Sequence, residues 1–244
     1  MQARLIHYHF LIEGKESLKF SVDLKRKYSK EKDAERHPFW AALNYHKCVV
    51  CPLSGSEFHH CPVAVDLQDV MATFSDTISH RRAEMHVLTP EREFVHHCDV
   101  QTGLNSLLGL IMATSACPIL SQLRPLANFH LPFATAEETL YRTVGAYLVK
   151  QYFVLQNGNK PDFELAGLGV LYQKLISLNT CFAARVRSAS EQDANINAVI
   201  RMDNFSILVL FALKDNLMHE KVKFYSGYEQ DEVQGGVNIA PPEA

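Results

Sequence analysis

The residues best suited to chemistry in this chain are the cysteines and histidines of residues 45–67, which we call the cysteine loop. Two residues separate Cys48 from Cys51, and nine more separate Cys51 from Cys61. A two-residue gap lets two thiolates turn toward one metal ion, and a structural zinc site needs four ligands in a tetrahedron. Three cysteines in one loop are therefore an incomplete metal site. The spacing predicts that another segment supplies the fourth ligand.

The fourth ligand has several candidates. Cys117 ends an apolar segment and precedes a proline, as Cys51 and Cys61 do, so the backbone is expected to turn outward there. We expect Cys117 to complete the site that Cys48 begins. The remaining candidates are His46, His59, His60 and Cys98. Cys181, in contrast, is expected to be a small buried hydrophobic residue of a long helix.

Zinc suits four thiolates and needs no further chemistry, so zinc is the metal that we expect. An iron–sulfur cluster is the alternative, because it is also held by four cysteines and because Cys-Pro is a familiar ending of bacterial cluster motifs. A thioredoxin-like dithiol is disfavoured. Its first cysteine must lie at the start of a helix, and Pro52 disfavours helical backbone at Cys51.

The composition is that of a globular protein, since 47% of the 244 residues are hydrophobic. The formal net charge of -3, without a block of like charges, gives no indication of a nucleic-acid or membrane-surface partner. No apolar run reaches the roughly eighteen residues of a membrane span, and no signal-peptide core is present. We therefore expect a soluble, cytoplasmic protein. In that reducing compartment a cluster of cysteines points first to metal.

Two segments have the alternation of apolar and polar residues that predicts β-hairpins. The first runs through residues 5–22 and turns at Gly14. The second runs through residues 83–97 and turns around Pro90. We expect the two hairpins to form one small antiparallel sheet.

The rest of the chain has helical periodicity, which predicts about five helices, the first of which follows the cysteine loop. Thr135 and Glu138 have the spacing of a capping box at the start of one helix. The side chains that this helix is expected to bury are Leu140, Val144, Leu148, Gln151 and Leu155. Asp162 is expected to cap the next helix, and the final helix is expected over residues 195–217.

These elements predict an α+β fold in which a small antiparallel sheet of two hairpins packs on a mainly helical bundle. Residues 1–225 are expected to form a single domain, because no Pro-, Gly- or Ser-rich linker separates the sheet from the helices. Residues 226–244 contain acidic residues, Gly-Gly and Pro-Pro pairs and few apolar anchors. We expect this tail to be disordered.

Several motifs occur together in this chain. They are the N-terminal hairpin, C-x2-C-P-L at residues 48–53, a later Cys-Pro pair, "GLIMATSACP", and "FHLPF" followed by "TLYRTVGAYLVKQYF". With this combination the chain resembles an uncharacterised bacterial protein family over most of residues 4–190. The resemblance implies no activity. It supports one set of residues, Cys48, Cys51, Cys61 and Cys117.

The leading functional hypothesis is a metal-binding protein, with zinc held by four cysteines, that acts through binding or interaction. The alternative is an iron–sulfur enzyme or electron carrier. A second alternative is a ligand-binding helical domain with a purely structural metal, because polar residues such as His130, Arg142 and Asn179 fall on the helical part. A buried hydrogen-bonded network is the arrangement that we expect for them. No phosphate-binding loop, nucleophile elbow or zinc-protease motif is present, which weakens the case for catalysis.

Overall fold

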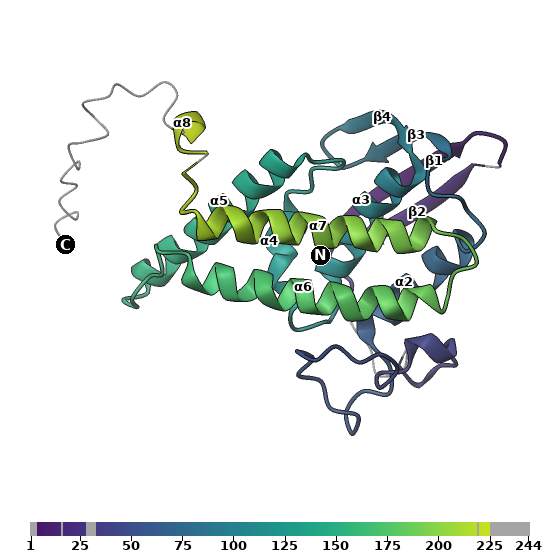
Figure 1. Cartoon of the computed structure of the whole chain (residues 1–244), viewed down its shortest axis with the longest axis horizontal. Helices are drawn as coiled ribbons and strands as arrows, with labels where there is room; N and C mark the ends of the chain where they lie inside the picture. Colours follow the sequence, from purple (N-terminus) through teal and green to yellow (C-terminus); the bar gives the residue numbers. More distant parts are fainter. Residues whose placement is uncertain (1–3, 16, 28–32, 219, 225–244) are drawn as a thin grey trace.

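The computed structural model describes residues 4–15, 17–27, 33–218 and 220–224 (Figure 1). The tail predicted to be disordered, residues 226–244, lies outside the described residues. The described part of the chain combines one antiparallel sheet with a larger number of helices. The predicted α+β class is therefore confirmed.

The sheet is built from the two predicted hairpins. Its strands are β1 (Leu5–Ile12), β2 (Leu18–Asp23), β3 (Arg82–Leu88) and β4 (Glu93–Asp99). They lie in the order β2-β1-β3-β4, and every neighbouring pair is antiparallel. The pairing of β1 with β3, in which Tyr8 is in register with Val87, joins the two hairpins into one sheet.

The helices make up most of the fold. The long ones are α2 (Pro62–Thr73), α3 (Val100–Thr114), α5 (Ala136–Gln156), α6 (Ala166–Arg187) and α7 (Ala194–Lys214). The short ones are η1 (Phe39–Ala41), η2 (Leu120–Leu123), α4 (Arg124–Asn128) and α8 (Lys221–Phe224). The long helices correspond to the five that the periodicity predicts, although α7 ends at Lys214 rather than at residue 217.

One face of the sheet packs on α3, which contacts β1, β3 and β4. Along β1 the buried side chains alternate with more exposed ones, as the period of a strand requires. The buried ones are Ile6, Tyr8, Phe10 and Ile12. At Gly103 of α3, an added Cβ would lie 2.7 Å from the Met85 Sδ atom of β3. Glycine at this position therefore lets the helix approach the strand closely.

One predicted helix start is present and another is shifted, since α6 begins at Ala166 with Leu165, not Asp162, as its N-cap residue. The Thr135 hydroxyl accepts from the Glu138 N–H at 3.2 Å, and the Glu138 carboxylate accepts from the Thr135 N–H at 2.8 Å, so the capping box begins α5. The Asp162 carboxylate accepts from the N–H groups of Ala166 at 3.2 Å and Gly167 at 2.7 Å. It thereby satisfies free donors in the first turn of α6.

The buried face of α5 is shorter than its periodicity predicts. Leu140, Val144 and Gln151 are buried as expected, but Leu148 is 37% exposed and Leu155 is 48% exposed. The second half of α5 extends away from the sheet, toward the left in Figure 1. Side chains there have less of the protein to pack against, so the prediction that Leu148 and Leu155 are buried is wrong.

Helices α6 and α7 lie side by side along much of their length (Figure 1). Helix α7 also packs on α3, and it contributes Ala198, Val199 and Val209 to the core. By length and composition alone, α7 is the one helix of the described residues that is long and apolar enough to cross a membrane. Its contacts with α3, α5 and α6 show that it also serves as a packing element of the helical body.

Candidate functional site

The first two cysteines form the tight turn that their spacing predicts. The Cys51 N–H donates to the Cys48 carbonyl oxygen at 2.9 Å, which closes a turn over the two residues between them. No helix begins at Cys48. The local structure therefore differs from that of a thioredoxin-like dithiol, whose first cysteine needs the N-terminus of a helix to stabilise a thiolate.

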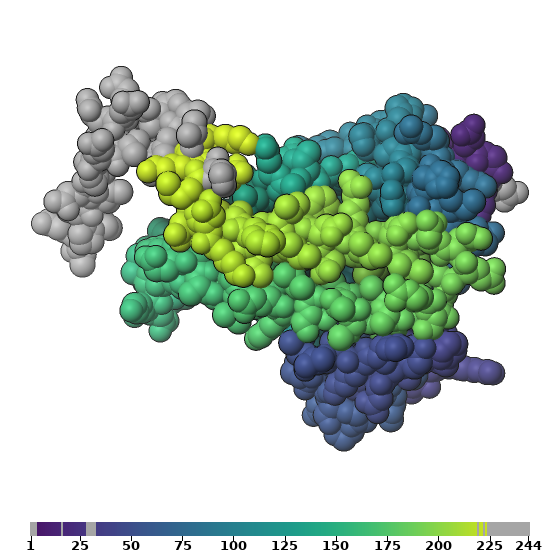
Figure 2. All heavy atoms as spheres, in the orientation of Figure 1, coloured from purple at the N-terminus to yellow at the C-terminus, as the bar shows by residue number. Residues whose placement is uncertain are grey.

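Cys61 is fixed by the pairing of the cysteine loop with the segment around η1. The Cys61 N–H donates to the Ala41 carbonyl oxygen at 2.8 Å, and the Leu43 N–H donates to the His59 carbonyl oxygen at 2.9 Å. Cys61 is also the N-cap residue of α2, which Pro62 begins. Backbone hydrogen bonds and the start of α2 therefore hold residues 59–61 of the cysteine loop in place. Figure 2 shows the loop within the dark blue lobe beneath α6.

The thiols of the predicted ligands lie close enough to affect one another's ionisation. Burial is the largest cause that raises the pKa of Cys48, to about 12, and neighbouring thiols add to it. In order of decreasing effect, these neighbours are Cys61, Cys181, Cys51 and Cys117. We call these five residues the cysteine site. Burial also raises the pKa of Cys61 and Cys117, with a smaller contribution from Cys51 to each.

In this structure the thiols do not form a coordination sphere. Among the described residues, no three His, Cys, Asp or Glu side chains form a group able to hold a metal ion. The Cys48 Sγ atom instead lies 3.9 Å from the Leu178 carbonyl oxygen of α6. Since a raised pKa keeps a thiol protonated at neutral pH, a metal ion must displace protons to bind here.

The other candidate ligands lie away from the cysteine site, face solvent or already contact other groups. Cys98 lies in β4, and its pKa is raised to about 11 mainly by burial rather than by another thiol. The His60 Nδ1 atom lies 2.9 Å from the backbone oxygen of Asp33. The ring of His46 packs against the preceding tyrosine ring, and His59 is exposed. Among the candidates from outside the loop, Cys117 is therefore the one that the fold brings to the other cysteines.

Arg185 of α6 is a fully buried cation next to the cysteine site, with 1% of its surface exposed. Its Nη1 atom donates to the carbonyl oxygens of Trp40 and Ala42, the latter at 2.7 Å, and its Nη2 atom donates to that of Leu43 at 3.3 Å. No Asp or Glu of the described residues forms an ion pair with it. Its charge opposes the effect of burial on the pKa of Cys61. A thiolate at Cys61 would be stabilised by this guanidinium.

Arg185 was expected only among the polar residues of the helical part, and neither it nor Cys181 was predicted to lie at the cysteine site. Cys181 is half-buried rather than buried, and its thiol affects the ionisation of Cys48. The two residues are four apart on α6, a spacing that places side chains on one helix face. Leu178, which accepts from Cys48, lies one turn earlier. The sequence does contain a signal for this arrangement, which is a cysteine and an arginine four residues apart within the apolar stripe of one helix.

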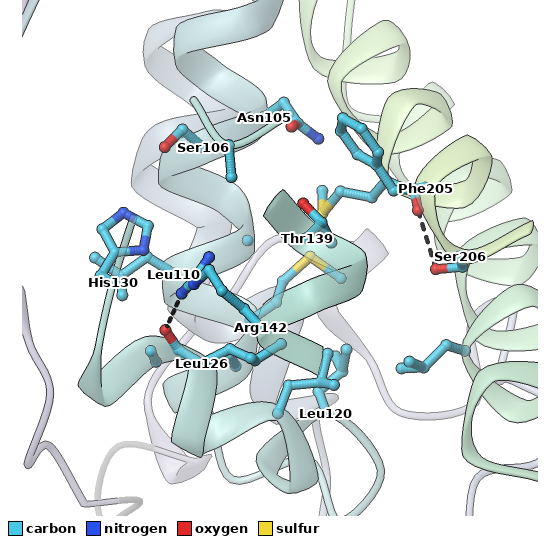
Figure 3. A pocket seen from close by; sticks show the side chains of 18 of the residues that line it. Asn105, Ser106, Leu110, Leu120, Leu126, His130, Thr139, Arg142, Phe205 and Ser206 are labelled. Carbon is cyan, nitrogen blue, oxygen red and sulfur yellow. Dashed lines mark hydrogen bonds between the residues drawn. The ribbon is translucent and has the colours of Figure 1, made fainter. Parts of the chain in front are cut away.

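A second candidate site is a cavity of about 190 Å³ in the helical body. It lies among α3, α4, α5, α6, α7 and the segment that follows α4 (Figure 3). Most of its wall is apolar, with side chains such as Leu110, Leu126 and Phe205. His130, Arg142 and Asn179 also line it, so these three polar residues named in the sequence analysis do meet at one cavity.

Each of these three polar residues already has a hydrogen-bond partner, and the Asn179 Nδ2 atom donates to the Ser206 hydroxyl at 3.3 Å. The Arg142 Nη2 atom donates to the carbonyl oxygens of Leu126 and Phe129, each at 2.8 Å, and Figure 3 shows the first of these bonds. The His130 Nε2 atom lies 2.5 Å from the Tyr8 hydroxyl of the sheet. Burial lowers the pKa of His130 to about 3, with a smaller contribution from the Arg142 charge. His130 is therefore neutral at physiological pH.

Comparisons with known proteins give a family but no activity. No curated protein and no solved structure matches this chain significantly. A protein-family model described as domain of unknown function (DUF6901) matches residues 6–225 of the 244. This range includes the sheet except its first residue, Leu5, together with the cysteine loop and all the long helices. The chain therefore belongs to the DUF6901 family.

Proposed function

We propose that this protein binds one zinc ion through the thiolates of Cys48, Cys51, Cys61 and Cys117. The ion fastens the cysteine loop to the helical body, and the protein acts in the cytoplasm through binding or interaction rather than catalysis. The observation that carries the proposal is the fully buried Arg185, which has neutral carbonyl partners and whose charge acts on the thiol of Cys61.

The charge of the site supports metal rather than free thiols. A buried cation without an anionic partner is strongly unfavourable, since leaving water costs several kcal/mol per ion. Four protonated thiols supply no counter-charge to Arg185. Four thiolates outweigh the two positive charges of a zinc ion, so the zinc complex is an anion. That complex would balance the guanidinium in a region of low dielectric.

The chain positions of the ligands support a fastening role. Cys48 and Cys51 belong to a turn, Cys61 begins α2, and Cys117 follows α3. An ion bound to all four ties three segments that are far apart in the sequence. Bringing such distant segments together costs chain entropy, so the metal is expected to bind after folding of the core has brought them close. The metal would therefore stabilise the docking of the loop rather than start folding.

The proposal is tested by metal analysis of protein purified without oxygen. We expect about one zinc per chain and no visible absorption, whereas an iron–sulfur cluster would absorb in the visible region. Cobalt(II) should replace zinc and give the absorption bands of tetrahedral thiolate coordination. The intensity of these bands reports the number of thiolate ligands, so it also shows whether the fourth ligand is a cysteine or a histidine.

Variants of single cysteines make the test specific. Cys48→Ser and Cys61→Ser should each lose most of the bound zinc, and Cys117→Ser should weaken it and alter the cobalt spectrum. Cys98→Ser is the matched control, because Cys98 is also a buried cysteine but lies in β4. Full zinc content in the first three variants would show that the proposed site does not exist. An altered spectrum in Cys181→Ser, with Cys117→Ser unchanged, would move the fourth position to Cys181.

A further inference from the structure

The cavity in the helical body has the size for a small organic molecule. An apolar cavity of roughly 150 Å³ holds one benzene molecule. The cavity of about 190 Å³ therefore has room for a ring and a short chain. Its walls are mainly apolar, as expected for a site that takes up the hydrophobic part of a ligand.

Arg142 is the one residue lining this cavity that carries a charge at neutral pH. The other polar lining residues are Asn105, Ser106, His130, Thr139, Tyr172, Asn179 and Ser206. Each of them is neutral, because burial holds the pKa of His130 near 3 and raises that of Tyr172 to about 12. The cavity thus combines apolar walls with a single positive charge.

The donors of Arg142 are only partly used. Its Nη2 atom donates to two carbonyl oxygens, and within the described residues neither Nε nor Nη1 donates a hydrogen bond. Glu138, one turn earlier on α5, raises the pKa of Arg142 but forms no ion pair with it, and its Oε2 atom accepts from the Thr135 N–H. Burial nevertheless lowers the pKa of Arg142 overall. An anion beside this guanidinium would therefore be stabilised.

We infer that this cavity binds a small carboxylic acid with an apolar body, held by its carboxylate on Arg142. Because Nη2 already donates to two carbonyl oxygens, the carboxylate would accept a charge-assisted hydrogen bond from Nη1 and would lie beside the guanidinium charge. The apolar body of the acid fills the space between α3 and α7, where Leu110 and Phe205 line the cavity. The neutral His130 adds no competing charge. This ligand site is independent of the zinc proposed above.

The first experiment compares three probes of nearly the same shape on the full-length chain. These are 3-phenylpropionate, 3-phenylpropionamide and 3-phenylpropylamine, with affinity measured by calorimetry and the contacted residues by amide chemical shifts. We expect the carboxylate to bind at least tenfold more tightly than the amide and the amine not to bind. The shifts should centre on residues 105–113 and on Arg142. Equal affinity for acid and amide, or no binding of the acid at millimolar concentration, would overturn the inference.

The second experiment fills the cavity. Gly109 of α3 lines it, and a Cβ added there would meet no atom within 4 Å, so Gly109→Leu extends a side chain into open space. Gly145→Leu is the matched control, because Gly145 is also a helical glycine with open surroundings but does not line this cavity. We expect Gly109→Leu to weaken binding of 3-phenylpropionate more than tenfold and Gly145→Leu to leave it unchanged. An equal loss in both variants would contradict the placement.

The third experiment separates charge from shape. Arg142→Gln should remove the preference for the acid over the amide, whereas Arg142→Lys should keep the preference at lower affinity. The amide spectrum of each variant establishes that it is folded. If either variant unfolds, the ratio of acid to amide affinity in the natural chain still decides the question. A preference that persists in folded Arg142→Gln would show that another residue holds the carboxylate.

Discussion

Arg185 of α6 donates from Nη1 to the carbonyl oxygen of Ala42 at 2.7 Å, across a sequence separation of 143 residues. With its bonds to Trp40 and Leu43, this contact holds the segment before the cysteine loop against the helical body. The fold therefore already has one attachment for the loop that depends on no metal. The proposed zinc ion supplies a second.

Replacing Arg185 should destabilise the protein strongly. Arg185→Leu leaves the carbonyl groups of Trp40 and Leu43 without this donor, whereas that of Ala42 still accepts from the Tyr45 N–H. Each unsatisfied buried group costs about 1–3 kcal/mol. We expect the free energy of unfolding, measured by urea titration, to fall by about 3 kcal/mol or more. Arg187→Leu on the same helix is the control, since Arg187 is exposed, and it should change stability by less than about 0.5 kcal/mol. Similar stability of the two variants would refute the anchoring role.

Zinc affinity should increase with pH. Burial raises the pKa values of Cys48, Cys61 and Cys117, so these thiols are protonated at neutral pH and must lose protons when they bind metal. Each thiol that is deprotonated on binding raises the association constant by about tenfold per pH unit. Competition with a chelating dye between pH 6 and 8, at roughly physiological ionic strength, measures this slope. A flat profile would mean that the ligands are not protonated thiols.

Removal of metal should loosen one part of the molecule only. A strong chelator is expected to increase hydrogen exchange in residues 45–67 and 112–118, because the ion fastens these segments to each other. Residues 140–155 should stay protected, since α5 has its own capping box and buried side chains. Uniform loss across the chain would make metal a requirement for global folding. Unchanged exchange at 112–118 would exclude Cys117 as a ligand.

His130 should make the folded state less stable in acid. Burial lowers its pKa from the ordinary 6.5 to about 3, so between these values the unfolded chain binds a proton that the folded chain does not. The contribution of His130 to the free energy of unfolding is therefore complete above pH 6.5 and is lost as the pH falls toward 3. His130→Gln should flatten the stability profile in this window, as measured by urea titration at each pH. Parallel profiles for the two proteins would show that His130 is not buried in the neutral form.

Two glycines of α3 should respond to alanine with opposite signs. Gly103→Ala forces a methyl group against Met85, and such overpacking costs about 1–3 kcal/mol. Gly109→Ala has open space around its Cβ and should stabilise the helix by about 0.5–1 kcal/mol. Thermal unfolding compares them directly. A stabilised Gly103→Ala would mean that α3 does not need this close approach to the sheet.

The sequence by itself determined the features that depend on neighbouring residues. The hairpins follow from the alternation of side chains along each strand, and the start of α5 follows from Thr135 and Glu138, three residues apart. The Cys48–Cys51 turn is equally local, because one hydrogen bond closes it. In each case the interacting groups lie within a few residues, so their spacing alone specifies the geometry.

Only the tertiary structure decided the contacts between distant segments. It joined β1 to β3, left Leu148 exposed at the far end of α5, and brought Arg185 to Ala42. It also gathered Cys117 and the other cysteines and placed Arg142 at a cavity. Periodicity identifies the apolar face of a helix but not the element that covers it. Which distant polar groups meet depends on the packing of the whole core, because a buried charge needs partners that no local pattern specifies.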